Sequence, residues 1–289
     1  MSKPKPFLTT DELEEGGYLK IDGNQVICLA SKIKRRITDP EEKVRAEYYL
    51  ELIKKYKYSD SRMQPNCKVP GRKPDVFADL VVFEDDEKKK PYIIVECKKD
   101  GISQAEIRQA IEQVFGYANS LRAKYAVVVA GTVRIAFDIA GFKPSEREKN
   151  IIADIPERYG KVIKFRFKKG DSENDLKVAT REELLAKFQQ CHDTLWQGGK
   201  RNPAEAFDEM SKLMFCKIWD ERFITKKGKD YKFQIGTHEN LKEITQRIRG
   251  IYSRAQKMEP GVFTEKIKAE DPIIYSVVEL LKGISLAGT

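Results

Sequence analysis

The sequence has little histidine, few cysteines and no long apolar run. Only two histidines occur, His192 and His238, which argues against nucleases built around histidine and against histidine-rich metal sites. The five cysteines form no CxxC pair, so neither a zinc knuckle nor a disulfide framework is indicated. No stretch approaches the roughly 18 apolar residues of a membrane span, and the N-terminus lacks the apolar core of a signal peptide. We therefore expect a cytoplasmic protein in a reducing compartment.

Charge, in contrast, is abundant. Charged residues make up 34% of the 289 residues and hydrophobic residues 40%, which is typical of a soluble globular protein with one large domain or two ordinary ones. The formal net charge is +9 and the pI is about 9.1. This excess favours a polyanionic partner, with nucleic acid first, while a generally solvated basic surface is the alternative.

Residues 74–99 contain two apolar segments that carry ionisable residues where a core strand should have none. The first segment includes Asp79, and the second includes the tripeptide Glu96-Cys97-Lys98. Because side chains alternate along a strand, Glu96 and Lys98 share one face, and Cys97 points to the opposite face as a small buried hydrophobe. A sheet that is buried on both faces makes such charges costly unless they serve a purpose.

An antiparallel hairpin would bring these charges together. If residues 84–91 form its turn, Phe83 lies across from Tyr92, and Asp79 then lies across from Glu96. Two carboxylates and an ammonium group are therefore expected at one end of the hairpin.

The rest of the N-terminal part alternates between strand and helix patterns. Asp39 is a predicted N-cap, and Ser103 with Glu106 forms a predicted capping box. The expected elements are a hairpin at 18–30 that adds edge strands to a sheet, helices at 40–56 and 103–122, and strands at 125–130 and 133–137. This order predicts an α/β domain over residues 1–178, with a mixed sheet flanked by helices.

The second predicted helix has two distinct faces. Apolar residues form its inward face, and a polar stripe at spacings of three and four contains Glu106, Gln109, Gln113 and Tyr117. Beyond a polar break at 171–175, amphipathic patterns predict a small all-α domain over residues 179–289.

Asp79, Glu96 and Lys98 form the minimum set of residues for phosphodiester hydrolysis. Such hydrolysis needs neutralisation of charge at phosphorus, a nucleophilic water and help for the leaving oxygen. Mg²⁺ takes oxygen ligands and keeps several waters, so one or two carboxylates with the scissile phosphate suffice. An adjacent lysine can stabilise the developing charge or orient the water.

This pattern resembles the PD-(D/E)xK nuclease superfamily, and within it the N-terminal nuclease domain of type I restriction enzyme R subunits. The resemblance implies that Asp79 and Glu96 bind Mg²⁺, which Mn²⁺ can replace, and that Lys98 is the catalytic lysine. The sequence PEEKVR at 40–45 resembles the opening helix of that group, which implies Glu42 as a third metal ligand. Gln113 and Tyr117 match the Q-x-x-x-Y signature and place Gln113 among the catalytic residues.

Each assignment has an alternative. Ala78 precedes Asp79 where the superfamily has proline, and Asp75, which follows Pro74, is therefore a rival ligand. Asp79, Glu96 and Lys98 could instead form a surface salt-bridge cluster. Glu42 could be a helix-capping residue, and Gln113 with Tyr117 could be ordinary surface residues.

A second resemblance lies in the helical part. The segments HDTLWQGG at 192–199 and NPAEAFDE at 202–209 resemble the N-terminal domain of N6-adenine DNA methylases of restriction-modification systems. The methylase N-P-P-Y motif, a glycine-rich S-adenosylmethionine loop and a G-x-x-x-x-G-K-[ST] phosphate loop are all absent from the sequence. We therefore expect neither methyl transfer nor ATP-driven translocation from this sequence, which looks like the front part of a longer restriction-modification polypeptide.

Together these resemblances imply a metal-dependent endonuclease domain of a type I or IIG-like restriction enzyme that acts on double-stranded DNA. A methyltransferase module and a specificity module, in the same polypeptide or as subunits, are the expected partners. Two alternatives stay open: a non-catalytic DNA-binding or assembly module with a nuclease-like fold, and a repair or recombination nuclease.

Overall fold

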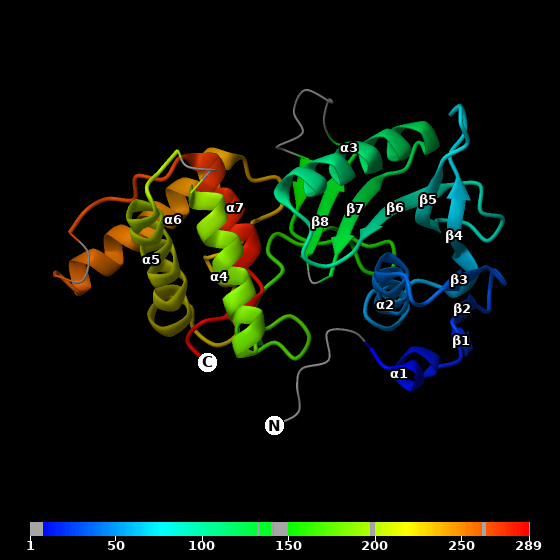
Figure 1. Ribbon diagram of the computed structural model, residues 1–289, viewed down its shortest axis with the longest axis horizontal. Helices are drawn as coiled ribbons and strands as arrows, with labels where there is room; N and C mark the ends of the chain where they lie inside the picture. Colours follow the sequence, from blue (N-terminus) through cyan, green and yellow to red (C-terminus); the bar gives the residue numbers. More distant parts are fainter. Residues whose placement is uncertain are drawn as a thin grey trace. The chain divides into compact units, whose positions relative to one another are not determined.

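The computed structural model describes residues 8–131, 133–139, 141, 150–196, 200–261 and 264–288. The chain forms two compact units, Met1–Ile163 and Lys164–Thr289. The first combines a sheet with flanking helices and the second is mainly helical, as the colours from blue to green and from green to red show in Figure 1. This arrangement confirms the predicted fold class.

The α/β unit is built on a mixed sheet with the described strand order β4-β5-β6-β7-β8-β9. The central strands β6 and β7 are parallel, and every other pair of neighbours is antiparallel. A parallel pair needs a crossover connection, and helix α3 supplies it. The bounds are β4 Met63–Lys68, β5 Phe77–Phe83, β6 Pro91–Lys98, α3 Gln104–Leu121, β7 Tyr125–Ala130, β8 Val133–Asp138 and β9 Ile151–Ile152.

Helices cover both faces of this sheet (Figure 1). Helix α2, Pro40–Lys54, packs Val44, Tyr48 and Leu52 into one hydrophobic core. Helix α3 contributes Ala110, Val114 and Ala118 to the other core. Because strand residues alternate between these two cores, the central strands read as continuous apolar runs, and all of β7 is buried.

The starts of both helices follow the predicted signals. The Asp39 side chain accepts a hydrogen bond from the Glu41 N–H, and Pro40 occupies the first turn of α2. The Ser103 and Glu106 side chains form the reciprocal capping box of α3. These caps fix where each helix begins, and they bring the N-terminus of α2 and the first turns of α3 to the cleft described below.

The predicted N-terminal hairpin forms, and it belongs to a separate sheet of order β1-β2-β3 and not to the six-stranded sheet. Strands β1, Leu19–Asp22, and β2, Gln25–Cys28, follow helix α1, Thr10–Glu14, and pair around the predicted turn. The free edge of β2 pairs with β3, Lys34–Arg36, instead of with the main sheet. The apolar residues Leu19, Val26 and Cys28 pack in the same core as α2.

The second unit begins before the helical region that the sequence predicts. Its boundary lies after Ile163, whereas the sequence pattern predicts a boundary after residue 178. Residues 164–178 belong to the second unit because their backbone bonds to later segments: β10, Lys177–Val178, pairs with β11, Ile284–Ser285, and the Phe167 carbonyl accepts from the Tyr231 N–H. Such long-range pairing leaves no local signal in the sequence.

Four long helices supply the core of this unit. Cys191, Leu213, Ile248 and Ile274 are among its fully buried side chains. A short π-helix, Asp220–Ile224, follows the second of these helices. The bounds are α4 Arg181–Trp196, α5 Pro203–Trp219, α6 Leu241–Met258 and α7 Asp271–Leu281. Residues 197–199 of the methylase-like stretch lie outside the described residues.

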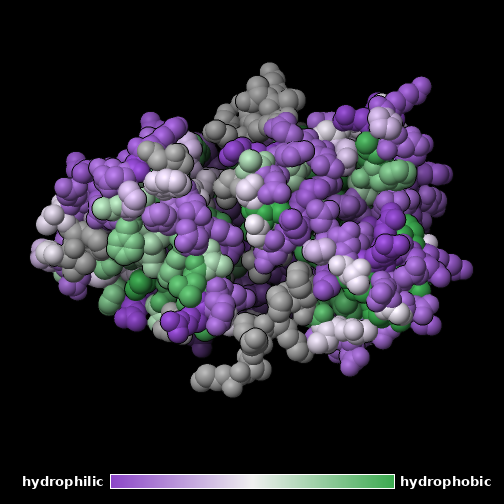
Figure 2. All heavy atoms as spheres, in the orientation of Figure 1, coloured by the Kyte–Doolittle hydropathy of each residue, from purple (hydrophilic) through white to green (hydrophobic). Residues whose placement is uncertain are grey.

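The face of the molecule drawn in Figure 2 is mostly hydrophilic. Figure 2 shows a green apolar area over the helical unit, and Leu185 on α4 and Phe207 on α5 are among its exposed large hydrophobic residues. Within the described ranges, the structure contains no helix of the length and hydrophobicity that crossing a bilayer requires.

Candidate active site

The hairpin of β5 and β6 has the predicted register at the end that carries the charges. Leu80 pairs with Val95 and Val82 with Ile93. At the turn end a bulge shifts the register, and Phe83 lies opposite Pro91. The prediction that Phe83 pairs with Tyr92 is therefore wrong. The bulge lies beyond Val82, and it therefore does not disturb the register near Asp79.

Asp79 and the Glu96-Cys97-Lys98 tripeptide are directly linked. The Asp79 carboxylate accepts a hydrogen bond from the Cys97 N–H at 2.7 Å. Cys97 itself is 1% exposed and lies in the core on the α2 side, as predicted. Asp79, Glu96 and Lys98 thus occupy the same end of two adjacent strands, with Glu96 and Lys98 on the face opposite Cys97.

Glu96 is a buried carboxylate with one satisfied and one unsatisfied oxygen. Its side chain is 2% exposed, and Oε1 accepts a hydrogen bond from Lys98 Nζ at 2.8 Å. Its Oε2 atom is buried and has no hydrogen-bond partner among the described residues. A buried acceptor without a partner is costly, and such an atom is a common mark of a functional site.

Burial and like charge make Glu96 a weak acid in this setting. Desolvation and the neighbouring Asp79 raise the pKa of Glu96 to about 8, against the opposing effect of Lys98. Desolvation likewise raises the pKa of Asp79, although the Cys97 N–H and Arg45 oppose it. Burial has the largest single effect on Lys98 and would lower its pKa, but the hydrogen bond to Glu96 and the charges of the neighbouring carboxylates together outweigh burial, and the net pKa is raised. Burial and like charge thus disfavour the ionised form of both carboxylates, and a cation bound between them would favour it.

A cleft of about 400 Å³ opens beside this group of charges. Lys98 lines it from β6, and Gln113 lines it from α3 together with Glu106 and Gln109, three members of the polar stripe seen in the sequence. The Gln113 side-chain amide donates to the Tyr117 hydroxyl at 2.9 Å, so the Q-x-x-x-Y pair is joined within α3. The structure thus places Gln113 at the same cleft as Lys98.

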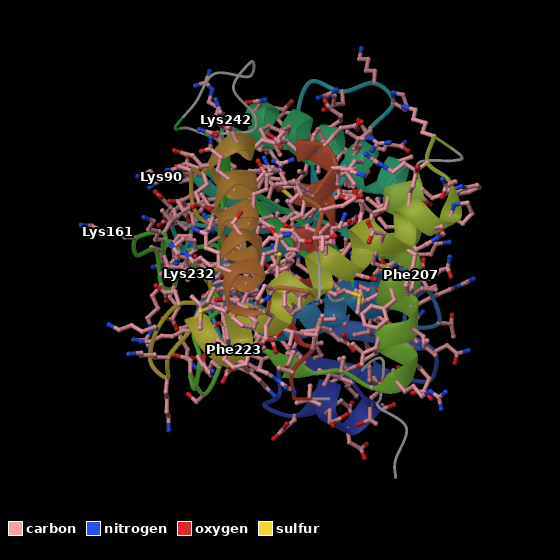
Figure 3. All side chains as sticks on the ribbon, turned by 90° about the vertical axis from the view of Figure 1, so that its left-hand side faces the viewer. Lys90, Lys161, Phe207, Phe223, Lys232 and Lys242 are labelled. Atoms are coloured by element: carbon pink, nitrogen blue, oxygen red, sulfur yellow. The ribbon has the colours of Figure 1, made fainter. Side chains whose placement is uncertain are left out.

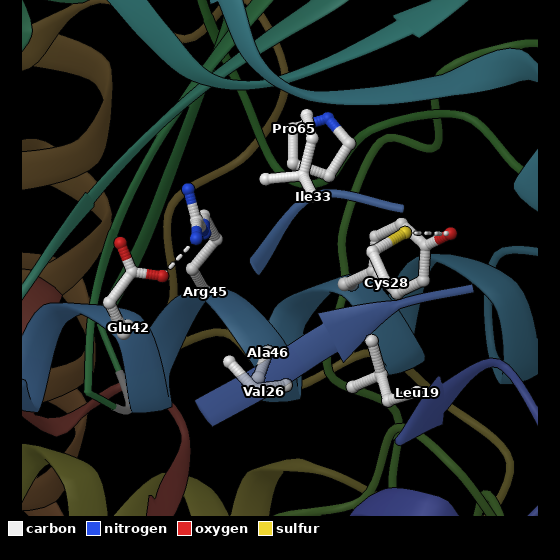
Figure 4. Close-up of a pocket in the computed structure, with 9 residues that line it drawn as sticks. Leu19, Val26, Cys28, Ile33, Glu42, Arg45, Ala46 and Pro65 are labelled. Atoms are coloured by element: carbon white, nitrogen blue, oxygen red, sulfur yellow. Dashed lines mark hydrogen bonds and ion pairs between the residues drawn. The ribbon is translucent and has the colours of Figure 1, made fainter. Parts of the chain in front are cut away.

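The predicted third ligand, Glu42, has two arginine partners. Its carboxylate accepts a hydrogen bond from the Arg45 guanidinium, drawn in Figure 4, and lies 3.8 Å from Arg35 Nε on β3. The Glu42 side chain also lines a small apolar cavity of about 30 Å³. Desolvation raises the pKa of Glu42, with Arg45 opposing the rise. The N-cap bond of α2 is made by Asp39, so the structure shows no capping role for Glu42.

Glu41 is a cleft residue that the sequence reasoning missed. It lines the 400 Å³ cleft with Lys98 and Gln113 and raises the pKa of both Glu96 and Lys98 electrostatically. Two consecutive glutamates at the start of the helix were the available signal. Which of them faces the cleft depends on the orientation of the helix, which spacing alone does not give.

The rival residue Asp75 lies apart from this group. Its carboxylate forms an ion pair with Lys68 at 2.7 Å, and both side chains are more than half exposed. A pair of this kind contributes little stability and has no contact with Glu96. The geometry therefore places Asp79 beside Glu96 and leaves Asp75 in the surface loop.

The donor set suits one hard cation. No group of three or more Asp, Glu, His or Cys side chains in the described ranges is close enough to form a closed metal site. Mg²⁺ does not need one, because it retains waters and binds one or two carboxylates together with a substrate phosphate. Asp79 and the unsatisfied Oε2 of Glu96 are oxygen donors of this kind.

The α/β unit thus combines a mixed sheet flanked by helices with two neighbouring carboxylates at one end of its β5–β6 hairpin. The family model described as type I restriction enzyme R protein N terminus (HSDR_N) matches residues 40–156. This match confirms the resemblance predicted for the α/β unit, and it covers all the candidate site residues. The matched segment ends before the helical unit, so the methylase-like resemblance there stays a prediction. The search of curated proteins found no match.

Proposed function

We propose that the α/β unit is a Mg²⁺-dependent endonuclease domain that hydrolyses phosphodiester bonds in double-stranded DNA. The observation that carries this proposal is the buried, unsatisfied Oε2 of Glu96, held beside Asp79 and next to Lys98, which lines an open cleft. A purely structural salt bridge would have no reason to leave a carboxylate oxygen without a partner.

In this proposal Asp79 and Glu96 hold the metal, and Glu42 is the third ligand that the resemblance implies. When bound, the metal supplies positive charge for the phosphate and a more acidic water. Lys98 lies at the cleft, where its ammonium group would contact the scissile phosphate or orient the attacking water. Gln113 would position that water or the phosphate from the opposite wall, with Tyr117 fixing its amide.

The family match supports a restriction-modification role, and we propose a methyltransferase module and a specificity module as partners. In such a system the α/β unit would cut the DNA, while other modules would recognise the sequence and its methylation state.

The test is nicking of supercoiled plasmid in Mg²⁺ or Mn²⁺ by the wild-type protein, a Lys98→Ala variant and a Lys89→Ala control. Lys89 is an exposed lysine in the turn between β5 and β6. We expect Lys98→Ala to slow nicking by about 100-fold or more, and Lys89→Ala to cut as the wild type does. Equal nicking by all three proteins would remove Lys98 from the mechanism.

Calorimetric titration with Mn²⁺ alone gives a second readout that does not depend on turnover. The wild type should bind Mn²⁺, and a Glu96→Gln variant should lose that binding. DNA binding without a carboxylate-dependent Mn²⁺ site would instead favour a non-catalytic DNA-binding module.

A further inference from the structure

The helical unit carries a concentrated basic surface outside the candidate active site. It consists of residues 164–170 and 226–232, which we call the basic ribbon. Each of these two segments contains four lysine or arginine residues, and the only carboxylate in either is Asp230. The ribbon therefore holds a local excess of positive charge that the folding of the unit does not explain.

Backbone hydrogen bonds join the two segments into one structure. The Tyr231 N–H donates to the Phe167 carbonyl at 3.1 Å, and the Lys169 N–H donates to the Lys229 carbonyl at 3.0 Å. The buried Gln234 side chain donates to the Phe167 and Tyr231 carbonyls and accepts from the Phe167 N–H, each at 2.8 Å. These bonds fix the spacing between the segments.

Buried groups also anchor the ribbon to the helices. Asp220, which is 0% exposed, accepts from the N–H groups of Lys232 and Phe233 at 2.7 and 2.8 Å. Lys169 Nζ donates to the Thr225 carbonyl at 3.0 Å, so this lysine is used for structure. These bonds fix the backbone of the ribbon on the packed helical unit. The other lysines of the ribbon therefore lie along a fixed backbone.

Five of these lysines are exposed and have no carboxylate partner. None of them forms an ion pair with a described Asp or Glu side chain, in contrast to buried lysines of the same unit such as Lys212. The exposed set is Lys164, Lys168, Lys226, Lys227 and Lys229. The acids that follow along the chain, Asp171 and Asp175, accept hydrogen bonds from backbone N–H groups instead.

The ring of Phe165 contacts three cations. The Phe165 ring lies 5.6 Å from Lys164 Nζ, 5.9 Å from Lys232 Nζ and 5.4 Å from the Arg247 guanidinium carbon. Such contacts hold Lys164 and Lys232 in place without neutralising them, whereas Arg247 also forms an ion pair with Glu239. Lys232 and the exposed Phe223 are both labelled in Figure 3.

We propose that the basic ribbon binds the phosphate backbone of double-stranded DNA and is a second DNA-contact surface on this protein. The choice of duplex DNA as the partner rests on the proposed function. The positive charge that would bind it is observed on the ribbon independently of that function. Unpaired lysines on a fixed base suit sequence-independent phosphate contacts. An acidic protein is the other class of partner with matching charge, but protein interfaces are depleted in lysine.

The test measures binding of a fluorescent duplex of about 25 base pairs by anisotropy, in EDTA so that no hydrolysis occurs, at several salt concentrations. The ribbon variant changes Lys168, Lys226, Lys227 and Lys229 to Gln. The control variant changes Lys20, Lys200, Lys257 and Lys266 to Gln, which are exposed lysines elsewhere with the same total charge. Melting temperatures equal to wild type confirm that both variants fold.

We expect the ribbon variant to lose about tenfold or more in affinity and to lower the slope of log affinity against log salt by about three to four. The control should change that slope by about one at most. Equal losses in both variants, or wild-type binding by the ribbon variant, would overturn the proposal. Binding of polyglutamate, but not of the duplex, by the wild type would reassign the ribbon to an acidic protein and overturn it too.

Failure of the nuclease proposal would give a different experimental result from failure of the ribbon proposal. A Lys98→Ala protein keeps the ribbon, so the ribbon-dependent part of duplex binding in EDTA should persist in it. Absence of plasmid nicking by the wild-type protein, with intact ribbon-dependent binding, would therefore contradict the proposed hydrolysis only.

Discussion

The Asp79 carboxylate accepts a hydrogen bond from the backbone N–H of Cys97, the residue between Glu96 and Lys98. This bond ties the acidic residue of one strand to the charged tripeptide of the next. It orients one oxygen of Asp79 into the sheet and fixes the carboxylate beside Glu96. A backbone donor is a precise positioning device, because it moves only if the strand moves.

Asp79 should be required for metal binding, and Asp75 should not. Asp79→Asn preserves the shape of the side chain and its ability to accept from the Cys97 N–H, but removes its charge. We expect Mn²⁺ affinity to fall by about tenfold or more, measured by calorimetric titration. The matched Asp75→Asn variant loses only an exposed ion pair with Lys68 and should bind within about twofold of wild type. The opposite ranking would identify Asp75 as the ligand.

Glu96 should make the metal-free protein less stable as pH rises. Its folded pKa of about 8 lies above its ordinary value of 4.5, so between these values the folded state holds a proton that the unfolded state has released. Stability from this group is therefore present at low pH and falls between about pH 4.5 and 8, by up to about 1.4 kcal/mol per pH unit.

Chemical denaturation in EDTA at several pH values measures this slope. Glu96→Gln cannot ionise and should flatten the decline across the same range. A variant that retains the full wild-type slope would show that another group is responsible.

The two glutamates at the start of α2 should have separable effects. Glu42→Gln leaves the buried Arg45 without its carboxylate partner, so we expect a loss of about 1 to 3 kcal/mol in unfolding free energy as well as weaker Mn²⁺ binding. Glu41 is exposed at the cleft, and Glu41→Gln should leave stability within about 0.5 kcal/mol while slowing plasmid nicking. If Mn²⁺ affinity drops only in Glu41→Gln, the third ligand is Glu41.

Glu209, within the methylase-like stretch, should contribute strongly to the stability of the helical unit. It is 3% exposed, accepts from the N–H groups of Lys268 and Ala269 at 2.8 and 2.7 Å, and pairs with the buried Lys212 at 2.7 Å. Glu209→Ala leaves that lysine with fewer partners and should cost about 3 to 5 kcal/mol by denaturant unfolding. Glu205→Ala, exposed on the same helix, is the control and should cost about 1 kcal/mol or less.

The sequence by itself determined the local structure and most of the site's composition. Asp39 with Pro40, and Ser103 with Glu106, determined where α2 and α3 begin, because caps act within a few residues. The period-two pattern placed Glu96 and Lys98 on one face and Cys97 in the core. Three residues of the predicted polar stripe of α3, Glu106, Gln109 and Gln113, line the cleft.

Only the tertiary structure decided the relations between distant segments. It placed Arg35 and Arg45 around Glu42, turned Glu41 into the cleft, and left Asp75 paired with Lys68. It also assigned residues 164–178 to the second unit and built the basic ribbon from segments far apart in the chain. These outcomes depend on helix orientation, on a β-bulge and on long-range pairing, which no local pattern of residues specifies.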